Sequence, residues 1–171
     1  MMSECRVAVI MGSDSDWKVM QSCVAQLEAL GLTAEVRVLS AHRTPGDLIK
    51  FVRSSSEQGI EVFIAAAGMS AALAGTVAAH TNRPVIGVPV DSGGLGGLDA
   101  LLSTVQMPPG VPVAGMAIGK PGARNAAILT AQILALNDDS VALALTALKK
   151  KQAEEVRRKD RGLRQGPASA L

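Results

Sequence analysis

The stretch RVAVIMGSDSD, residues 6–16, decides the fold that we expect for this chain. Residues 6–11 are a short run rich in branched apolar side chains, as in a strand that is buried on both faces. Gly12 and the Ser and Asp residues after it end this run and are typical of a helix start. The stretch therefore predicts a buried strand that leads directly into a helix.

The same alternation of strand and helix recurs along the rest of the chain. We expect further strands at residues 34–39, 62–67, 85–90 and 113–118, with helices between most of them. Apolar strands that alternate with helices form a parallel sheet covered on both faces, with right-handed crossovers. The sequence thus predicts an α/β protein, a three-layer αβα sandwich around a doubly wound parallel sheet of about five strands.

Helical spacing of apolar residues continues beyond the last predicted strand. We expect helices at residues 126–136 and from 141 to about 159. With 171 residues, of which 48% are hydrophobic, the chain fits one domain. We place this domain at residues 1–160 and expect a flexible tail at 161–171.

The aromatic content is too low for a nucleic-acid surface built on stacked rings. The chain has three aromatic residues, which are Trp17, Phe51 and Phe63. From Lys149 onward it carries 8 basic and 3 acidic residues. We interpret this basic end as a solvated helix rather than as a nucleic-acid site, because acidic residues are interspersed in it.

Cysteine spacing and hydropathy indicate the expected compartment. Cys5 and Cys23 lack the spacing of a zinc site or of a disulfide framework, and we expect both to fill the core. The apolar runs are shorter than the ~18 residues that suggest a membrane span, and the first residues lack the apolar segment of a signal peptide. We therefore expect a cytoplasmic protein without a metal site or a membrane partner.

The loop after the first predicted strand is a candidate phosphate site, because ligands of doubly wound sheets bind at the carboxyl ends of the strands. Gly12, Ser13 and Ser15 place free N–H groups and two hydroxyls at a helix start, where an anion is stabilised. Ser and Asp are also ordinary N-cap residues, so capping is the competing interpretation. Asp16 suits both, since a carboxylate beside a phosphate site is well placed to accept a ribose hydroxyl.

The loop after the second strand, SAHRTP at residues 40–45, contains the best catalytic candidate. His42 can exchange a proton near neutral pH, and Arg43 can bind two oxygens of a phosphate or a carboxylate. We expect Ser40 to line the same site and Thr44 to cap the following helix. A structural hydrogen bond is the competing interpretation of His42.

The loop after the third strand is expected to form a wall of the site rather than to supply a reagent. Gly68 and Ser70 lie at the start of an Ala-rich helix that we expect to run from Gly68 to near His80. Ser70 acting only as a helix cap is the alternative, and we interpret His80 as a C-terminal cap. The glycine-rich insert at 91–110 is expected to be a binding loop or a subunit contact.

Five motifs, in the order of the chain, resemble the PurE family of purine biosynthesis. They are GSDSDW at 12–17, SAHRTP at 40–45, PVIGVPV at 84–90, VQMP at 105–108 and NAA at 125–127. The resemblance covers about residues 5–136, and five collinear motifs are far more specific than any one of them. It implies a flavodoxin-like subunit in a homo-octamer with active sites where subunits meet, and a reaction without a metal or an organic cofactor.

The resemblance also implies an activity and residue roles. In the family, the carboxylate on N5 of N5-carboxyaminoimidazole ribonucleotide moves to C4 of the imidazole, by release and recapture of CO₂. Ser13 and Arg43 match contacts to the substrate phosphate, Asp16 matches the ribose contact, and His42 matches the general acid and base. The other residues of the expected binding site are Gly12, Ser15, Ser40, Gly68 and Ser70.

The third loop departs from the mutase pattern of the family. Ala72 stands where mutases carry a His, and Ser70 resembles the Ser of a second branch, which carboxylates aminoimidazole ribonucleotide directly with CO₂. Met69 stands where that branch has an Arg, and the segments around the fourth strand follow the mutases, so we favour the mutase. A non-catalytic module that binds a phosphoribonucleotide is the alternative from another class.

The Ala-rich helices suggest contacts between copies of the chain. The C-terminal helix is amphipathic through Val141, Leu143, Leu145 and Leu148, and we expect it to pack on a neighbouring subunit. The expected partners are therefore phosphoribosyl aminoimidazole compounds, CO₂ and further copies of the chain.

Overall fold

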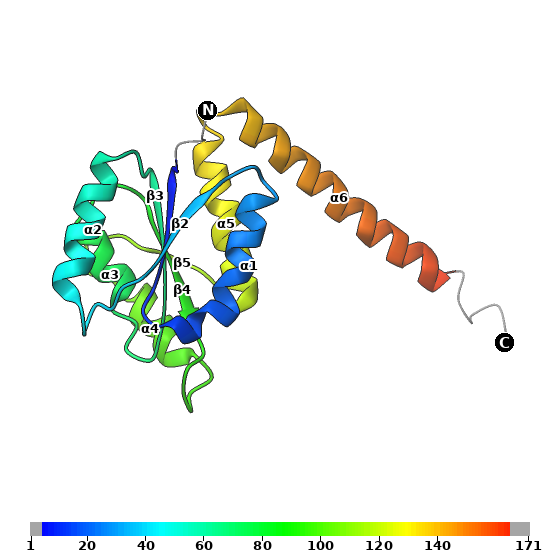
Figure 1. Ribbon diagram of the computed structural model, residues 1–171. Helices are drawn as coiled ribbons and strands as arrows, with labels where there is room; N and C mark the ends of the chain where they lie inside the picture. Colours follow the sequence, from blue (N-terminus) through cyan, green and yellow to red (C-terminus); the bar gives the residue numbers. More distant parts are fainter. Residues whose placement is uncertain (1–4, 165–171) are drawn as a thin grey trace.

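Five parallel strands form the centre of the protein, whose computed structural model describes residues 5–164 (Figure 1). They are β1 (Val7–Met11), β2 (Ala34–Val38), β3 (Val62–Gly68), β4 (Val85–Val90) and β5 (Ala114–Gly115). Their order in the sheet is β2-β1-β3-β4-β5, the flavodoxin-like order with its topological switch point between β1 and β3. The predicted fold class is confirmed.

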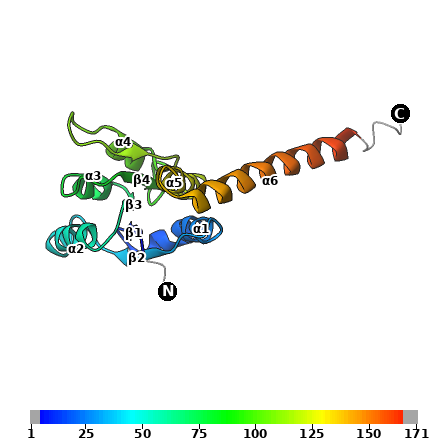
Figure 2. The ribbon, with the colours of Figure 1, turned by 90° about the horizontal axis from the view of Figure 1, so that it is seen from above.

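Helices flank the sheet on both faces. They are α1 (Trp17–Glu28), α2 (Pro45–Glu57), α3 (Leu73–Ala78), α4 (Leu98–Val105), α5 (Lys120–Leu134) and α6 (Asp139–Arg164). Figure 2 shows α2, α3 and α4 on one face and α1 and α5 on the other, while α6 extends away from the body. A turn of 3-10 helix, η1 (Asp14–Asp16), precedes α1.

The central strands are buried on both faces, as their continuous apolar runs predict. Every residue of β1 and of β4 is buried. One core cluster lies between the sheet and the α1–α5 layer, and a second lies between the sheet and the layer of α2 and α3. The edge strand β2 is partly exposed, in keeping with its alternating charged residues.

The fifth strand and the helix after it differ from the expected ranges. We predicted a strand at residues 113–118, but β5 pairs with β4 only at Ala114 and Gly115. Beyond them the chain bonds more sparsely, with the N–H of Gly119 donating to the carbonyl of Pro89 at 2.9 Å. α5 begins at Lys120 rather than at residue 126, because Pro121 in its first turn is compatible with a helix start.

Two other helix boundaries were also wrong. The helix expected from Gly68 begins only at Leu73, because the chain first turns through residues 69–72. The helix expected to end near 159 continues to Arg164, so that residues 161–164 of the predicted tail are helical. The rest of that tail, residues 165–171, lies outside the described residues.

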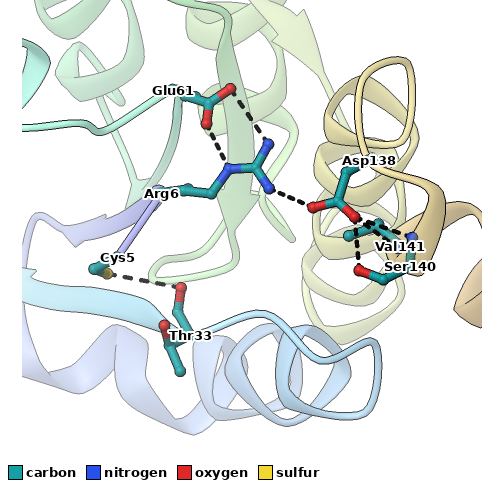
Figure 3. Close-up of polar contacts among 7 residues, drawn as sticks. All are labelled: Cys5, Arg6, Thr33, Glu61, Asp138, Ser140 and Val141. Carbon is teal, nitrogen blue, oxygen red and sulfur yellow. Dashed lines mark hydrogen bonds and ion pairs between the residues drawn. The ribbon is translucent and has the colours of Figure 1, made fainter. Parts of the chain in front are cut away.

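An ion-pair network connects the start of α6 to the amino ends of β1 and β3 (Figure 3). The guanidinium of Arg6 donates to the carboxylate of Glu61 at 2.5 Å and to that of Asp138 at 2.6 Å. Asp138 also accepts the backbone N–H groups of Ser140 and Val141 and so caps α6. The hydroxyl of Ser140, followed by Arg6 and Val141, lowers the pKa of Asp138 to about 2.

The two cysteines have different surroundings. Cys23 is buried in the core, where desolvation raises the pKa of its thiol to about 12. Cys5 is only partly buried, and its Sγ lies 3.7 Å from the carbonyl of Thr33. The expectation that both fill the core therefore holds for Cys23 alone.

The C-terminal helix packs on the body only through its first turns. Within the described residues of α6, Val141 and Leu145 are the buried ones, and both belong to the core cluster beside α5. Figure 1 shows the remaining turns leaving the body. Within residues 5–164 there is no helix that is both long and apolar enough to cross a lipid bilayer.

Candidate active site

A cavity of about 680 Å³ opens at the carboxyl ends of the strands. The loops after β1, β2 and β3 line it, together with Ser92 after β4. This is the switch point at which ligands of doubly wound sheets bind. The nine residues expected in the site all line this one cavity: Gly12, Ser13, Ser15, Asp16, Ser40, His42, Arg43, Gly68 and Ser70.

The loop after β1 is held by its own polar groups. The Oγ of Ser13 accepts the N–H of Ser15 at 3.3 Å and the hydroxyl of Ser15 at 2.9 Å. The N–H of Ser13 donates to the carboxylate of Asp16 at 3.2 Å, which completes a capping box around η1. The residues cap this turn, as the competing interpretation held, and they also line the cavity.

Asp16 is a buried carboxylate at the base of this loop, with 2% of its surface exposed. Its burial raises its pKa, and the neighbouring Asp14 acts in the same direction. The hydrogen bond from Ser13 opposes the shift. A buried carboxylate that accepts a single hydrogen bond retains the capacity to accept another donor, such as a hydroxyl of a bound ligand.

Arg43 joins the loop after β2 to the loop after β1. Its Nη2 donates to the carbonyl of Gly12 at 2.9 Å, and its backbone N–H donates to the hydroxyl of Ser40 at 3.1 Å. The guanidinium carries five donors, so these contacts leave others available for a ligand. The arrangement places a fixed positive charge beside the hydroxyls of Ser13 and Ser15, which suits an anion.

His42 lies in the same loop and is exposed. Its ring makes no hydrogen bond to the other residues that the structure describes, so the competing structural interpretation has no contact to support it. Its imidazole is the side chain of this cavity that can both give and take a proton near neutral pH. The geometry therefore leaves the ring of His42 available for contact with a molecule in the cavity, beside the guanidinium of Arg43.

The wall formed by the loop after β3 is made mainly of small and apolar groups. An ideal Cβ on Gly68 would lie 2.2 Å from the Oγ of Ser92 and 2.9 Å from the carbonyl of Val90, so the close approach of these loops requires a glycine. Met69 adopts a left-handed conformation with φ of 56°. Sequence reasoning missed Ser92, since nothing in the glycine-rich insert marks which residue approaches Gly68.

Three predicted caps can be compared with the structure. Thr44 is at the N-cap of α2, as predicted, but its hydroxyl bonds to the backbone of Ser40 rather than to α2. Ser70 does not cap α3, which has Ala72 at its N-cap. The cap position of Thr44 is therefore confirmed, whereas Ser70 as a cap was wrong, because backbone bonds turn the chain through residues 69–72 before α3 starts. His80 is confirmed as a cap, with Nδ1 at 2.8 Å from the carbonyl of Thr76.

The cavity thus combines an anion-binding side, a free imidazole and an apolar wall. No three His, Cys, Asp or Glu side chains among the described residues lie close enough together to hold a metal ion. The groups present can bind a phosphate or carboxylate, accept a hydroxyl and transfer a proton. Fold and cavity together define a flavodoxin-like α/β protein with a polar cavity at the carboxyl ends of its strands.

The chain belongs to the AIR carboxylase family, whose model matches residues 6–155. It is 51% identical over 150 residues to an N5-carboxyaminoimidazole ribonucleotide mutase of Brucella melitensis, covering 88% of this chain and 93% of that protein. It is 51% identical over 151 residues to the protein of the same name from Escherichia coli strain K12, covering 88% and 89%. The crystal structure of Treponema denticola PurE superimposes with a TM-score of 0.85 at 27% identity, covering 93% of this chain and 98% of that one.

Proposed function

We infer that this protein is an N5-carboxyaminoimidazole ribonucleotide mutase of purine biosynthesis, an isomerase that moves a carboxylate from N5 to C4. Relatives of that name are about half identical to it over most of both chains. The observation that carries the residue assignment is the single cavity in which His42 and Arg43 lie with Ser13 and Asp16. The ligand of such an enzyme has an anionic phosphate, a ribose and an imidazole, and the cavity offers a group for each.

The substrate phosphate is assigned to the side of the cavity that Arg43 and the Ser13 hydroxyl form. The guanidinium supplies charge, and the N–H groups and hydroxyls of the loop after β1 supply hydrogen bonds. Asp16 accepts a hydrogen bond from a ribose hydroxyl, as a carboxylate does well. In this role its negative charge does not face the substrate phosphate. The remaining lining residues, among them Ser15, Ser40, Gly68 and Ser70, shape the pocket around the ring.

His42 is assigned as the general acid and base. Its imidazolium donates a proton to N5 as the bond between N5 and the carboxylate carbon breaks, which leaves aminoimidazole ribonucleotide and CO₂. C4 then attacks CO₂, and the neutral imidazole of His42 removes the proton from C4. One proton has moved from C4 to N5, and His42 returns to its starting state. A positioned acid and base contributes about 10²- to 10⁴-fold to the rate.

Proton transfer is only part of the task, because CO₂ has to stay beside the ring between the two steps. A CO₂ molecule that escapes must return from dilute solution, whereas reactants held together gain up to about 7–11 kcal/mol. The loop after β3 and the glycine-rich insert lie on the side of the cavity that can provide this enclosure. Water exclusion also strengthens the contacts to the charged groups of the substrate.

Direct carboxylation of aminoimidazole ribonucleotide by CO₂ is the second candidate. It is favoured by Ala72 and Ser70, which depart from the mutase pattern and line the cavity. The two reactions share the second chemical step and differ in the substrate that binds. The identity to the mutases leads us to place this candidate second.

The test is to give the purified protein either N5-carboxyaminoimidazole ribonucleotide, or aminoimidazole ribonucleotide with bicarbonate at modest concentration. We expect efficient formation of 4-carboxy-5-aminoimidazole ribonucleotide from the first substrate and little from the second. The reverse result supports the direct carboxylase. Binding of the nucleotide without conversion of either substrate supports a non-catalytic module.

The assembly is assigned as a homo-octamer in the cytoplasm. The apolar side chains that α4 and the loop before it expose, Leu95, Leu98, Leu102 and Val105, suit a contact between copies of the chain. Of the four apolar residues through which we expected α6 to pack on a neighbouring subunit, Leu143 is exposed and available for such a contact, whereas Val141, Leu145 and Leu148 pack on the core of their own chain. Light scattering on a purified sample should give the mass of eight copies of the 17.6 kDa chain, and a monomer would contradict this assignment.

A further inference from the structure

Ser92 is the residue that the loop after β4 contributes to the cavity. It is exposed, and its hydroxyl makes no hydrogen bond to the other residues that the structure describes. No step of the proposed mechanism uses it. A serine hydroxyl carries one donor and two acceptor positions, so this group is available to a molecule bound in the cavity.

Two close backbone approaches hold Ser92 at its place. An ideal Cβ on Gly68 would lie 2.2 Å from the Oγ of Ser92, so the serine packs directly on the loop after β3. Behind it the insert folds back, since an ideal Cβ on Gly97, whose φ is 80°, would lie 3.3 Å from the Cα of Asp91. The insert therefore presents the Ser92 hydroxyl from a fixed position.

The strand order places Ser92 across the cavity from the side assigned to the phosphate. Arg43 follows β2 and Ser13 follows β1, whereas β4 lies beyond β3 in the order β2-β1-β3-β4. Two strand spacings, about 10 Å in all, separate β1 from β4. A ribose and an imidazole ring separate the phosphate of the proposed substrate from its carboxylate. The carboxylate end of the substrate therefore reaches towards the loops after β3 and β4.

This side of the cavity has no positively charged side chain among the described residues. Met69, Ala72 and Leu73 are apolar, and the side-chain donors are the hydroxyls of Ser70 and Ser92, of which Ser92 packs on the neighbouring loop. A fixed cation here would stabilise the carboxylate and oppose its conversion to neutral CO₂. A hydroxyl orients the carboxylate through a hydrogen bond at a smaller cost to that step.

We propose that Ser92 is a substrate-binding residue whose hydroxyl donates a hydrogen bond to the carboxylate, on N5 in the substrate and on C4 in the product. This inference rests on the proposed function and deepens it. Ser92 exchanges no proton in either step. Because the carboxylate loses its charge as it becomes CO₂, the bond stabilises bound substrate and product more than the transition state between them.

The test uses Ser92→Ala, which removes the hydroxyl and keeps the Cβ. Ser22→Ala is the matched control, because its hydroxyl donates to the carbonyl of Val19 at 2.6 Å on α1, outside the cavity. Calorimetry measures the Kd for 4-carboxy-5-aminoimidazole ribonucleotide and for aminoimidazole ribonucleotide, which lacks the carboxylate. Both variants are combined with His42→Asn for this measurement, so that the bound nucleotide is not converted, and His42→Asn alone is the parent protein.

We expect Ser92→Ala to weaken binding of the carboxylated nucleotide about tenfold or more, as for the loss of a hydrogen bond to a charged group, and to leave that of aminoimidazole ribonucleotide within about twofold. Ser22→Ala should change neither. With His42 present, Ser92→Ala should raise KM for the N5-carboxylated substrate by a similar factor, with a much smaller change in kcat.

Two results in solution would overturn the inference. One is an unchanged affinity of Ser92→Ala for the carboxylated nucleotide. The other is an equal loss of affinity for both nucleotides, since Ser92 would then shape the pocket rather than bind the carboxylate.

A structure of His42→Asn with the carboxylated nucleotide bound gives a measurement that does not depend on the folding of Ser92→Ala. We expect the Oγ of Ser92 within hydrogen-bond distance of the carboxylate. A carboxylate bound only by other groups would overturn the inference.

The outcome separates this inference from the proposed function. A wild type that converts the N5-carboxylated substrate, with a Ser92→Ala variant that binds the product as tightly as its parent, refutes the role of Ser92 and leaves the mutase assignment standing. A wild type that converts neither this substrate nor aminoimidazole ribonucleotide with bicarbonate refutes both.

Discussion

The charged groups at the amino ends of the parallel strands differ in role from those at the carboxyl ends. At the amino ends, Arg6 forms ion pairs with Glu61 and Asp138, and the pKa of Asp138 is lowered to about 2. At the carboxyl ends, burial raises the pKa of Asp16, and His42 is exposed. The difference indicates that the ion pairs at the amino ends stabilise the fold. The polar groups at the carboxyl ends stay available for a ligand, at some cost in stability.

The largest effect that we expect is on catalysis, from His42→Asn. Because His42 is exposed, we expect the melting temperature to be unchanged and substrate affinity to stay within about tenfold, while turnover falls about 10²- to 10⁴-fold. His80→Asn is the matched control, since His80 lies far from the cavity at the end of α3. Steady-state kinetics measure both variants, and a normal rate for His42→Asn would remove this residue from the mechanism.

Arg43→Lys should give the next largest effect. Lysine keeps the charge but loses the planar fork that bonds to Gly12 and is available to the phosphate. Hydrogen bonds to charged groups contribute about 1.5–3 kcal/mol, so KM should rise roughly tenfold to a hundredfold. Arg53→Lys on the exposed side of α2 is the control and should leave KM unchanged, and an equal rise in both variants would argue against a phosphate contact by Arg43.

Asp16→Asn tests, at the carboxyl ends of the strands, how the Asp16 carboxylate affects both activity and stability. A raised pKa means that Asp16 contributes stability below the ordinary pKa of a carboxyl group, and that this contribution is lost as the pH rises through the raised value. At pH 7 we therefore expect Asp16→Asn to melt no lower than the wild type, while the weaker ribose contact raises KM by about tenfold. Thermal melts from pH 3 to pH 7 measure the first effect, and a variant that melts lower at pH 7 would show that the carboxylate stabilises the fold.

Asp138→Asn tests whether the ion-pair network at the amino ends of the strands stabilises the fold. It should have the smallest effect on activity. The lowered pKa means that Asp138 contributes stability above its ordinary pKa of 3.8, and that this contribution is lost as the pH falls towards about 2. The variant should melt lower than the wild type at pH 7, with a difference that shrinks between pH 4 and pH 2, and its turnover should be unchanged. Asp139→Asn is the control, and equal melting of Asp138→Asn and wild type would mean that the network adds no stability.

The sequence predicted the members of the cavity better than the ends of the helices. Residues from three separate loops meet because parallel strands place their carboxyl ends on one edge, and a strand-to-helix pattern is visible in the sequence. The contact between Gly68 and Ser92 was not predictable, because it depends on how the insert after β4 folds back. The late start of α3 was not predictable either, since methionine gives no signal of the positive φ at Met69.

A structure of the protein with aminoimidazole ribonucleotide bound tests the central claim most directly. We predict the phosphate within hydrogen-bond distance of Arg43 and the Ser13 hydroxyl, a ribose hydroxyl on Asp16, and the ring of His42 in contact with the imidazole, directly or through one water. A nucleotide bound elsewhere on the protein, or a His42 side chain directed away from the imidazole, would contradict it.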